Sequence, residues 1–312
     1  MILITKLLKI VLLIIGLCVI LIVAFYGHKD IPLSDLKLKY APPPSSFITV
    51  DGMDVHYRDE GSIADSVPVV LIHGTSSSLQ TFDDWAAILK SKKRVIRMDI
   101  PAFGLTGPFP DRNYSIDNYV LFIEHFLSAI GVNSCILGGN SLGGEIAWQV
   151  AFKNPRLVDK LVLINAAGYP VGGDKSEPIA FTIARLPILN KILTYITPRS
   201  IVREGMENVY VDKSKIIEVL VDRYFELTLR EGNRQALVDR MTLKTDTGKI
   251  HLIKNIQQST LVLWGEHDLL IPTDNAQRFH NDLPNDSLII LKDVGHVPMK
   301  ESPAAVLAFL KI

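Results

Sequence analysis

Cysteine is nearly absent from this chain of 312 residues, which contains only Cys18 and Cys135. Cys18 lies inside a long apolar segment, whereas Cys135 opens a short apolar stretch typical of a buried strand. A disulfide bond between residues in such different settings is not expected. The main domain must therefore fold on its hydrophobic core, without a covalent cross-link.

An excess of charge of either sign is also lacking, because 33 lysines and arginines balance 33 aspartates and glutamates. A chain without a basic excess gives no signal for nucleic-acid binding, and we expect no nucleic-acid partner. The eight histidines show no spacing typical of metal ligands, and no G-x-G-x-x-G motif opens a nucleotide site. We therefore expect neither a metal nor another cofactor, and nothing in the sequence indicates an oligomeric state.

One long hydrophobic run is present near the N-terminus, from Ile10 to Tyr26, and Lys6 and Lys9 precede it. As a helix, its 17 residues would span roughly 25 Å, the short end of what crosses a hydrocarbon core. A cleaved signal peptide is the alternative, but the run offers no clean A-x-A pattern. We predict a transmembrane anchor over residues 1–27, and the short basic start favours a single-pass membrane protein with an extracytoplasmic domain.

Proline marks the boundary between this run and the main domain. Residues 28–45 include Pro42–Pro44, which cannot lie inside a helix and favour an extended stalk. Beyond the stalk, amphipathic stretches alternate with apolar ones; those expected as strands are VPVVLIHG, RVIRMDI, SCILGGN, KLVLIN, STLVLWG and SLIILKD. Near-continuous apolar strands that alternate with helices predict an α/β fold, in which helices cover both faces of a mostly parallel central sheet.

One interval interrupts the alternation. Residues 169–245 contain several amphipathic helical pieces but no convincing strand, and they are too many for a structureless loop. We predict that they form a helical cap over one end of the sheet, inserted into a core made of residues 46–168 and 246–312. Apolar side chains of the cap would form one wall of a pocket; they are Ile179, Phe181, Ile183, Leu186, Ile188 and Leu189.

A serine crowded by glycines lies where a strand is expected to turn into a helix, in the stretch CILGGNSLGGEIAW. Two interpretations are open: the glycines only form a tight turn, or the turn presents Ser141 as a nucleophile. Gly139 and Gly143 lack the side chains that would collide in a sharp strand-to-helix turn, which leaves the seryl oxygen exposed. The helix N-terminus and the N–H of Leu142 would then face negative charge that develops at the serine.

A nucleophilic serine needs a base to take its proton and an acid to orient that base. Candidates follow two later strands: WGEHDLLIP contains Glu266, His267 and Asp268, and DVGHVPMKESP contains His296. Successive strand ends of such a sheet carry the order serine, acid, histidine, so we select Asp268 as the acid and His296 as the base. Glu266 and His267 are expected in a solvated loop.

Two further loops carry polar residues at strand ends. HGTSSS, at residues 73–78, is expected to supply a second backbone donor, the N–H of Thr75, beside that of Leu142. His73 in this loop and Asp99 in MDIPAFGLTG are alternative catalytic groups, but we expect both to brace their loops through hydrogen bonds.

Five motifs together resemble the α/β-hydrolase superfamily, over nearly the whole chain after the stalk. In chain order they are the HG loop, the D-x-P-x-F-G loop, GNSLGG, WGxxDxxxP and GHxPxxExP. The chain is most similar to bacterial single-chain members, here with a membrane anchor and a helical cap. The resemblance implies a Ser141 nucleophile, a His296 base, an Asp268 acid, and oxyanion donors at Thr75 and Leu142.

The same fold carries several reactions, and the enzymes with an aspartate nucleophile are excluded because position 141 is serine. C–C bond hydrolases of the meta-cleavage-product type also contain GNSxGG. Their oxyanion loop resembles a Gly-Pro-Gly type, and a tryptophan usually follows the catalytic histidine. This chain has HGTSSS at the oxyanion loop and GHVPMK around the histidine. We predict hydrolysis of carboxylic esters of apolar small molecules, with C–C hydrolysis as the alternative and a catalytically silent, ligand-binding member as a third interpretation.

Overall fold

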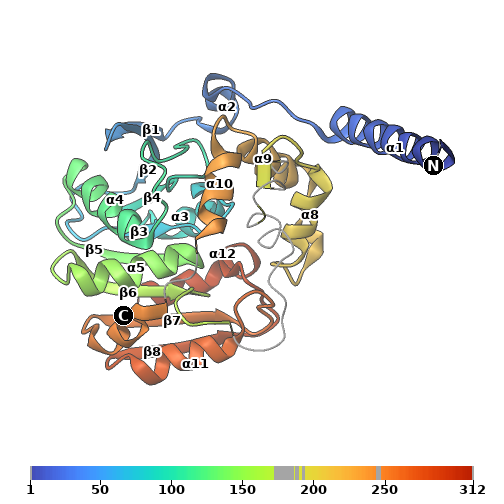
Figure 1. Cartoon of the computed structure of the whole chain (residues 1–312). Helices are drawn as coiled ribbons and strands as arrows, with labels where there is room; N and C mark the ends of the chain where they lie inside the picture. The colour runs from blue at the N-terminus through green and yellow to red at the C-terminus, as the bar shows by residue number, and fades with distance from the viewer. Residues whose placement is uncertain (1, 172–185, 187–189, 192–193, 244–246, 311–312) are drawn as a thin grey trace.

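The computed structural model describes residues 2–171, 186, 190–191, 194–243 and 247–310. An eight-stranded sheet lies at its centre, with the strand order β1-β2-β4-β3-β5-β6-β7-β8 (Figure 1). The strands are β1 (Ser45–Val50), β2 (Met53–Glu60), β3 (Val69–Ile72), β4 (Val95–Met98), β5 (Cys135–Asn140), β6 (Val158–Ile164), β7 (Ser259–Gly265) and β8 (Asp286–Leu291). β2 pairs antiparallel with β1 and β4, and the other neighbours are parallel, which confirms the predicted α/β fold with a mostly parallel sheet.

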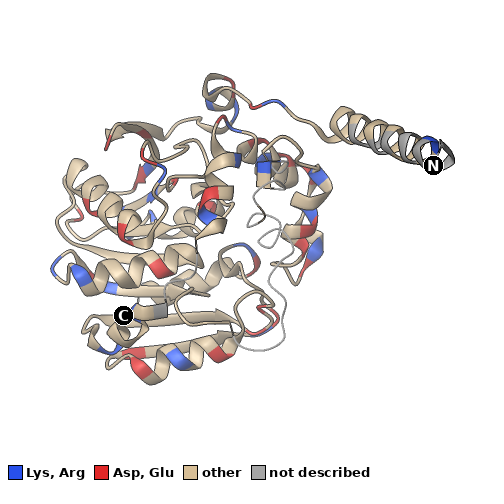
Figure 2. Ribbon diagram, in the orientation of Figure 1, with Lys and Arg blue, Asp and Glu red and all other residues tan. Residues whose placement is uncertain are grey.

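Helices cover both faces of this sheet. One face carries α4 (Ile116–Ala129), α5 (Leu142–Lys153) and α11 (Thr273–Asp282); the other carries η1 (Leu79–Phe82), α3 (Asp83–Leu89) and η4 (Pro303–Leu310). The remaining helical elements are α1 (Ile2–Tyr26), α2 (Leu33–Tyr40), α8 (Arg199–Glu207), η2 (Lys213–Lys215), α9 (Glu218–Thr228), α10 (Asn233–Thr242), η3 (Thr247–Asn255) and α12 (Pro298–Glu301). Charged residues of both signs are interspersed over the outer helices (Figure 2), in keeping with the balanced composition.

The central strands are apolar on both faces because helices bury both. In β3, Val70 and Ile72 belong to the core beneath α4 and α5, whereas Val69 and Leu71 belong to the core beneath α3 and η4. All four side chains are fully buried. Successive side chains of a strand point to opposite faces, so one continuous apolar stretch fills both cores. Each such side chain contributes about 1.5–3 kcal/mol through its burial.

The chain between β6 and β7 lies outside the sheet. In its described residues this segment forms α8, α9 and α10 and contains no strand. Of the apolar side chains expected to line the pocket, Leu186 is 45% exposed; the others, namely Ile179, Phe181, Ile183, Ile188 and Leu189, lie outside the described residues. The limits of a cap at residues 169–245, and its function as a pocket wall, stay predictions.

Helix α2 lies within the predicted stalk and packs on the domain. Leu36 of α2 is buried in a cluster with Leu105 and Leu227, and Lys39 Nζ lies 2.7 Å from the carboxylate of Glu226 on α9. The structure therefore differs from an extended stalk over this helix. The three prolines that favoured an extended chain follow α2 directly and restrict only the residues after its end.

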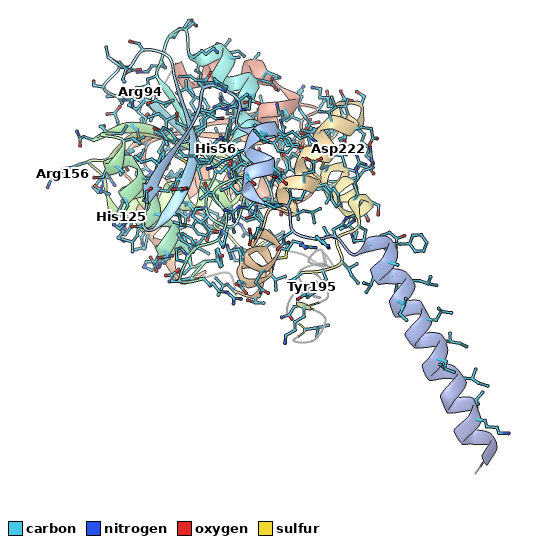
Figure 3. The ribbon with its side chains drawn as sticks, turned by 90° about the horizontal axis from the view of Figure 1, so that it is seen from above. His56, Arg94, His125, Arg156, Tyr195 and Asp222 are labelled. Carbon is cyan, nitrogen blue, oxygen red and sulfur yellow. The ribbon has the colours of Figure 1, made fainter. Side chains whose placement is uncertain are left out.

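Helix α1 extends away from the domain (Figures 1 and 3). Across the described part of the chain, no helix is found that is both long and apolar enough to cross a membrane. This finding contradicts the predicted single-pass anchor at residues 1–27, and with it the predicted membrane partner and extracytoplasmic location. That prediction rests on the hydropathy and length of the run and on the lysines before it.

Candidate active site

Ser141 lies at a sharp turn between β5 and α5. Its backbone angles are φ 55° and ψ −119°, and L-residues seldom adopt a positive φ. A Cβ atom on Gly139 would collide with the carbonyl of Gly143, and one on Gly143 would collide with the carbonyl of Ile72. Glycine at these two positions therefore lets strand and helix approach closely around a strained serine, a geometry that exposes the seryl oxygen in nucleophile elbows.

His296 and Asp268 form a buried hydrogen-bonded pair. The distance between His296 Nδ1 and Asp268 Oδ2 is 2.7 Å, and each residue is only 4% exposed. Asp268 Oδ1 also accepts hydrogen bonds from the backbone N–H groups of Leu270 and Ile271, at 2.8 and 2.9 Å. With the carboxylate fixed in this way, the tautomer that suits the pair has Nδ1–H donating to Asp268, which leaves the lone pair on Nε2.

Two asparagines that the sequence reasoning missed connect these loops. Asn140 Nδ2 donates to the carbonyl oxygens of His296 and Ile164, both at 3.1 Å, and so joins the residue before Ser141 to the histidine loop. Asn165 Nδ2 donates to Asp268 Oδ2 at 2.7 Å. Both asparagines end a strand or follow one directly, which is the only signal in the sequence that could have identified them.

The loop at residues 73–78 contacts the serine turn. A Cβ atom added to Gly74 would lie 2.9 Å from the Cβ of Ser141, so the backbone of the loop passes beside the serine. Thr75 and Leu142, whose N–H groups are the expected oxyanion donors, directly follow these two residues. The structure thus brings the two peptide segments together, and their function in stabilising an oxyanion stays a prediction.

His73 braces its loop, as expected. It is fully buried, its Nδ1 lies 2.8 Å from the carbonyl oxygen of Gly74, and its Nε2 accepts a hydrogen bond from the N–H of Ile100 at 3.1 Å. Both ring nitrogens are therefore engaged by backbone groups. Burial lowers the pKa of His73 below its ordinary value, although Asp99 nearby opposes this change. A neutral imidazole held on both sides is suited to support rather than proton transfer.

Asp99 also braces the loops around the site. Its carboxylate accepts hydrogen bonds from the N–H groups of Leu79 and Leu105, at 2.7 and 2.8 Å, and lies 2.7 Å from Nδ1 of His56. Burial alone would raise the pKa of Asp99, but the attraction of His56 and these hydrogen bonds outweigh it and hold the pKa below its usual range. The carboxylate is enclosed on all sides by structural partners, in agreement with the expected bracing function.

The exposed loop after β7 contains Glu266 and His267, the two other titratable residues of the WGEHDLLIP motif. Glu266, His267 and Asp293 have side-chain ligand atoms within 4.8 Å of one another, and all three residues are exposed. Exposed acidic groups often gather without a bound ion, so this cluster carries no metal assignment. Glu266 and His267 lie in a solvated loop, as predicted.

Residues 69–309 match the model of the Alpha/beta hydrolase family, and the chain therefore belongs to that family. Among its relatives is the uncharacterized hydrolase YugF of Bacillus subtilis, 28% identical over 85% of this chain and 96% of that protein. A 2-hydroxy-6-oxo-6-(2'-aminophenyl)hexa-2,4-dienoic acid hydrolase of Metapseudomonas resinovorans is 29% identical over 85% of this chain and 90% of that protein.

Lipase 1 of Psychrobacter immobilis is 25% identical over 86% of this chain and 81% of that protein. Among solved structures, the meta-cleavage product hydrolase of Pseudomonas fluorescens superposes with a TM-score of 0.71, at 23% identity, over 85% of this chain and 97% of that one. Family and fold thus confirm the α/β-hydrolase resemblance and identify the chain as a hydrolase. The relatives include one named as a lipase and one named as a dienoic acid hydrolase, so the family alone does not choose a reaction.

Proposed function

We propose that this hydrolase cleaves carboxylic esters of apolar small molecules through an acyl-enzyme on Ser141. The observation that carries the proposal is the 2.7 Å hydrogen bond between His296 and Asp268. It accompanies a serine with a positive φ, Ser141, at the turn between β5 and α5. Serine, acid and histidine follow strand ends in the order that this reaction requires on such a sheet. The expected chemistry is that of a Ser-His-Asp triad.

In the first half of the reaction, Ser141 Oγ attacks the ester carbonyl carbon while His296 Nε2 takes the hydroxyl proton. Asp268 stays ionised and stabilises the imidazolium through Nδ1. The N–H groups of Thr75 and Leu142 bind the oxyanion of the tetrahedral intermediate. The C–O bond to the alcohol then breaks, and the alcohol leaves with the proton from His296. Water repeats these steps on the acyl-enzyme and releases the acid.

C–C bond hydrolysis is the second candidate, because the relative from Metapseudomonas resinovorans, which is 29% identical to this chain, is named as a dienoic acid hydrolase. The oxyanion loop HGTSSS and the segment GHVPMK differ from the pattern expected of that subfamily, which supports the ester reaction. A catalytically silent protein is the third candidate, and any turnover that depends on Ser141 excludes it.

A series of p-nitrophenyl esters tests the proposal. Each additional methylene that the pocket buries contributes about 0.8 kcal/mol, so kcat/KM should rise close to fourfold per methylene until the pocket is filled. Activity that is flat or falls from acetate to hexanoate would contradict an apolar pocket. Turnover of a vinylogous dienoate acid, with none of the esters, would favour the C–C hydrolase instead.

A further inference from the structure

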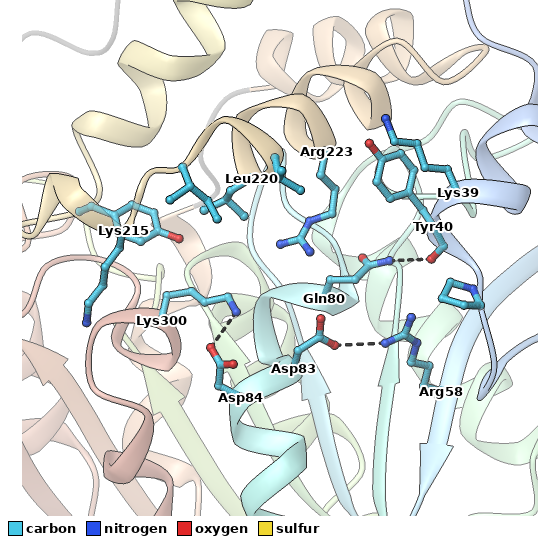
Figure 4. Close-up of a pocket in the computed structure, with 14 residues that line it drawn as sticks. Lys39, Tyr40, Arg58, Gln80, Asp83, Asp84, Lys215, Leu220, Arg223 and Lys300 are labelled. Carbon is cyan, nitrogen blue, oxygen red and sulfur yellow. Dashed lines mark hydrogen bonds and ion pairs between the residues drawn. The ribbon is translucent and has the colours of Figure 1, made fainter.

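A cavity of about 570 Å³ lies between α9 and the elements η1 and α3 (Figure 4). Its volume falls in the range of about 300–1,000 Å³ that is typical of small-molecule sites. Ser141, Asp268 and His296 are not among the residues that line it. The cavity is therefore distinct from the site formed by the candidate triad.

Three polar atoms of the residues that line the cavity are buried and have no hydrogen-bond partner within the described chain. They are Gln80 Oε1, the hydroxyl of Tyr210 and Nε of Arg223. Gln80 Nε2 donates to the carbonyl oxygen of Tyr40 at 3.1 Å, so the orientation of the amide is fixed and Oε1 is the atom without a partner. Buried polar atoms are nearly always hydrogen-bonded. Thirteen such atoms lack a partner in the described part of the chain, and the gathering of three of them around this one cavity favours a polar ligand there.

The charges around the cavity favour an anion. Five basic and two acidic side chains line it. Both acids are paired with two of these bases, Asp83 with Arg58 at 3.2 Å and Asp84 with Lys300 at 2.8 Å. A third base, Lys39, lies 2.7 Å from Glu226. Arg223, in contrast, forms no hydrogen bond or ion pair with any residue that the structure describes, and its guanidinium group points towards Gln80 and Asp83 (Figure 4).

We propose that this cavity is a second ligand site, which binds a small organic anion with a carboxylate or phosphate head and a short apolar body. Arg223 binds the head through charge-assisted hydrogen bonds, and the hydroxyl of Tyr210 donates to it. Gln80 Oε1 accepts a hydrogen bond from the P–OH group of a monoprotonated phosphate or phosphonate head, a donor that an ionised carboxylate lacks. Leu220 and Ile217, of which Ile217 is 60% exposed, contact the apolar body.

Isothermal titration of the full chain with benzoate and with phenylphosphonate, at an ionic strength held constant with sodium chloride, tests the site. The two probes share an apolar ring and differ in the head group, so their relative affinity separates carboxylate from phosphate chemistry. We expect saturable binding of at least one probe. Arg223→Gln should weaken it at least about tenfold, since a hydrogen bond between charged groups is lost.

Arg156→Gln is the matched control, because it removes the same charge from an exposed position far from α9. Figure 3 shows Arg156 and Asp222, a neighbour of Arg223 on α9, on opposite sides of the domain. The control should bind like the wild type. Absence of saturable binding for both probes, or equal weakening by the two substitutions, would overturn the proposal. Neither measurement requires turnover, so the result is independent of the proposed ester hydrolysis.

Tyr210→Phe gives a second and sharper test, because its two effects should have opposite signs. The hydroxyl has no hydrogen-bond partner among the described residues, so its removal should leave the urea midpoint of unfolding unchanged or raise it. The same change should weaken probe binding severalfold, because it deletes a donor to the head group. A variant with a lower midpoint and unchanged binding would assign Tyr210 a structural function and contradict the site.

Discussion

Asn165 connects the acid and the histidine of the candidate triad. Its Nδ2 donates to Asp268 Oδ2 at 2.7 Å, the same oxygen that lies 2.7 Å from His296 Nδ1. The amide also lies 3.4 Å from the carbonyl oxygen of Gly295, the residue before the histidine. Asn165 has a φ of 45°, which asparagine tolerates better than most residues. A residue outside the triad thus fixes the positions of two of its members.

Asn165→Asp should lower kcat/KM for a preferred ester at least about tenfold. The substitution tolerates the same backbone angle, but it removes the donor and adds a second carboxyl group beside Asp268. Asn165→Gly keeps the backbone angle and removes the hydrogen bonds without adding charge, so its loss should be smaller. Urea unfolding of both variants controls for folding. A glycine variant as active as the wild type would contradict the positioning function.

Gly139→Ala should destabilise the protein by more than about 2 kcal/mol, since the new methyl group collides with backbone rather than with a movable side chain. Gly205→Ala is the matched control. Gly205 lies in α8 with nothing within 4 Å of an added methyl group, so the same substitution should stabilise by about 0.5–1 kcal/mol. Urea unfolding measures both. Equal effects would show that packing at the serine turn is not tight.

Stability should fall as the pH drops below about 6.5, and His73 should account for part of this fall. Burial lowers the pKa of His73 in the folded chain, so the unfolded chain binds a proton near pH 6.5 while the folded chain stays neutral. The unfolded state is then favoured by up to about 1.4 kcal/mol per pH unit until the folded pKa is reached.

Unfolding free energies at about pH 7.5 and pH 5.5 measure this contribution. His73→Gln should be less stable at both values but lose less on acidification than the wild type. If the wild type and His73→Gln lose the same amount, His73 does not titrate as described.

Much of the fold could be predicted from the sequence because its signals are local. The central strands are continuous apolar stretches, and α5 begins at Leu142, where the glycine-flanked serine predicts the turn from strand to helix. Ser141, Asp268 and His296 each sit in a short motif after a strand, and parallel strands bring such positions to one edge of a sheet.

The contacts between distant residues could not be predicted in the same way. Asn165 reaches Asp268 across 103 positions, and Gln80, Tyr210 and Arg223 come from separate elements that only the folded chain brings around one cavity. Helix α2 was not predicted, because the three prolines after it favoured an extended chain over the whole segment. The hydropathy and length of the N-terminal run, with the lysines before it, predicted a membrane span, which the structure contradicts.

Covalent labelling with a fluorophosphonate probe, followed by intact-mass and peptide analysis, tests whether Ser141 is the nucleophile. We expect one adduct per chain, on Ser141, with no adduct on Ser141→Ala. Asp268→Asn should label at least about 10³-fold more slowly, because His296 loses its orienting partner, whereas Glu266→Gln should label like the wild type. An unlabelled wild-type chain, or an adduct on a residue other than Ser141, would contradict the assignment of a serine nucleophile at the turn between β5 and α5.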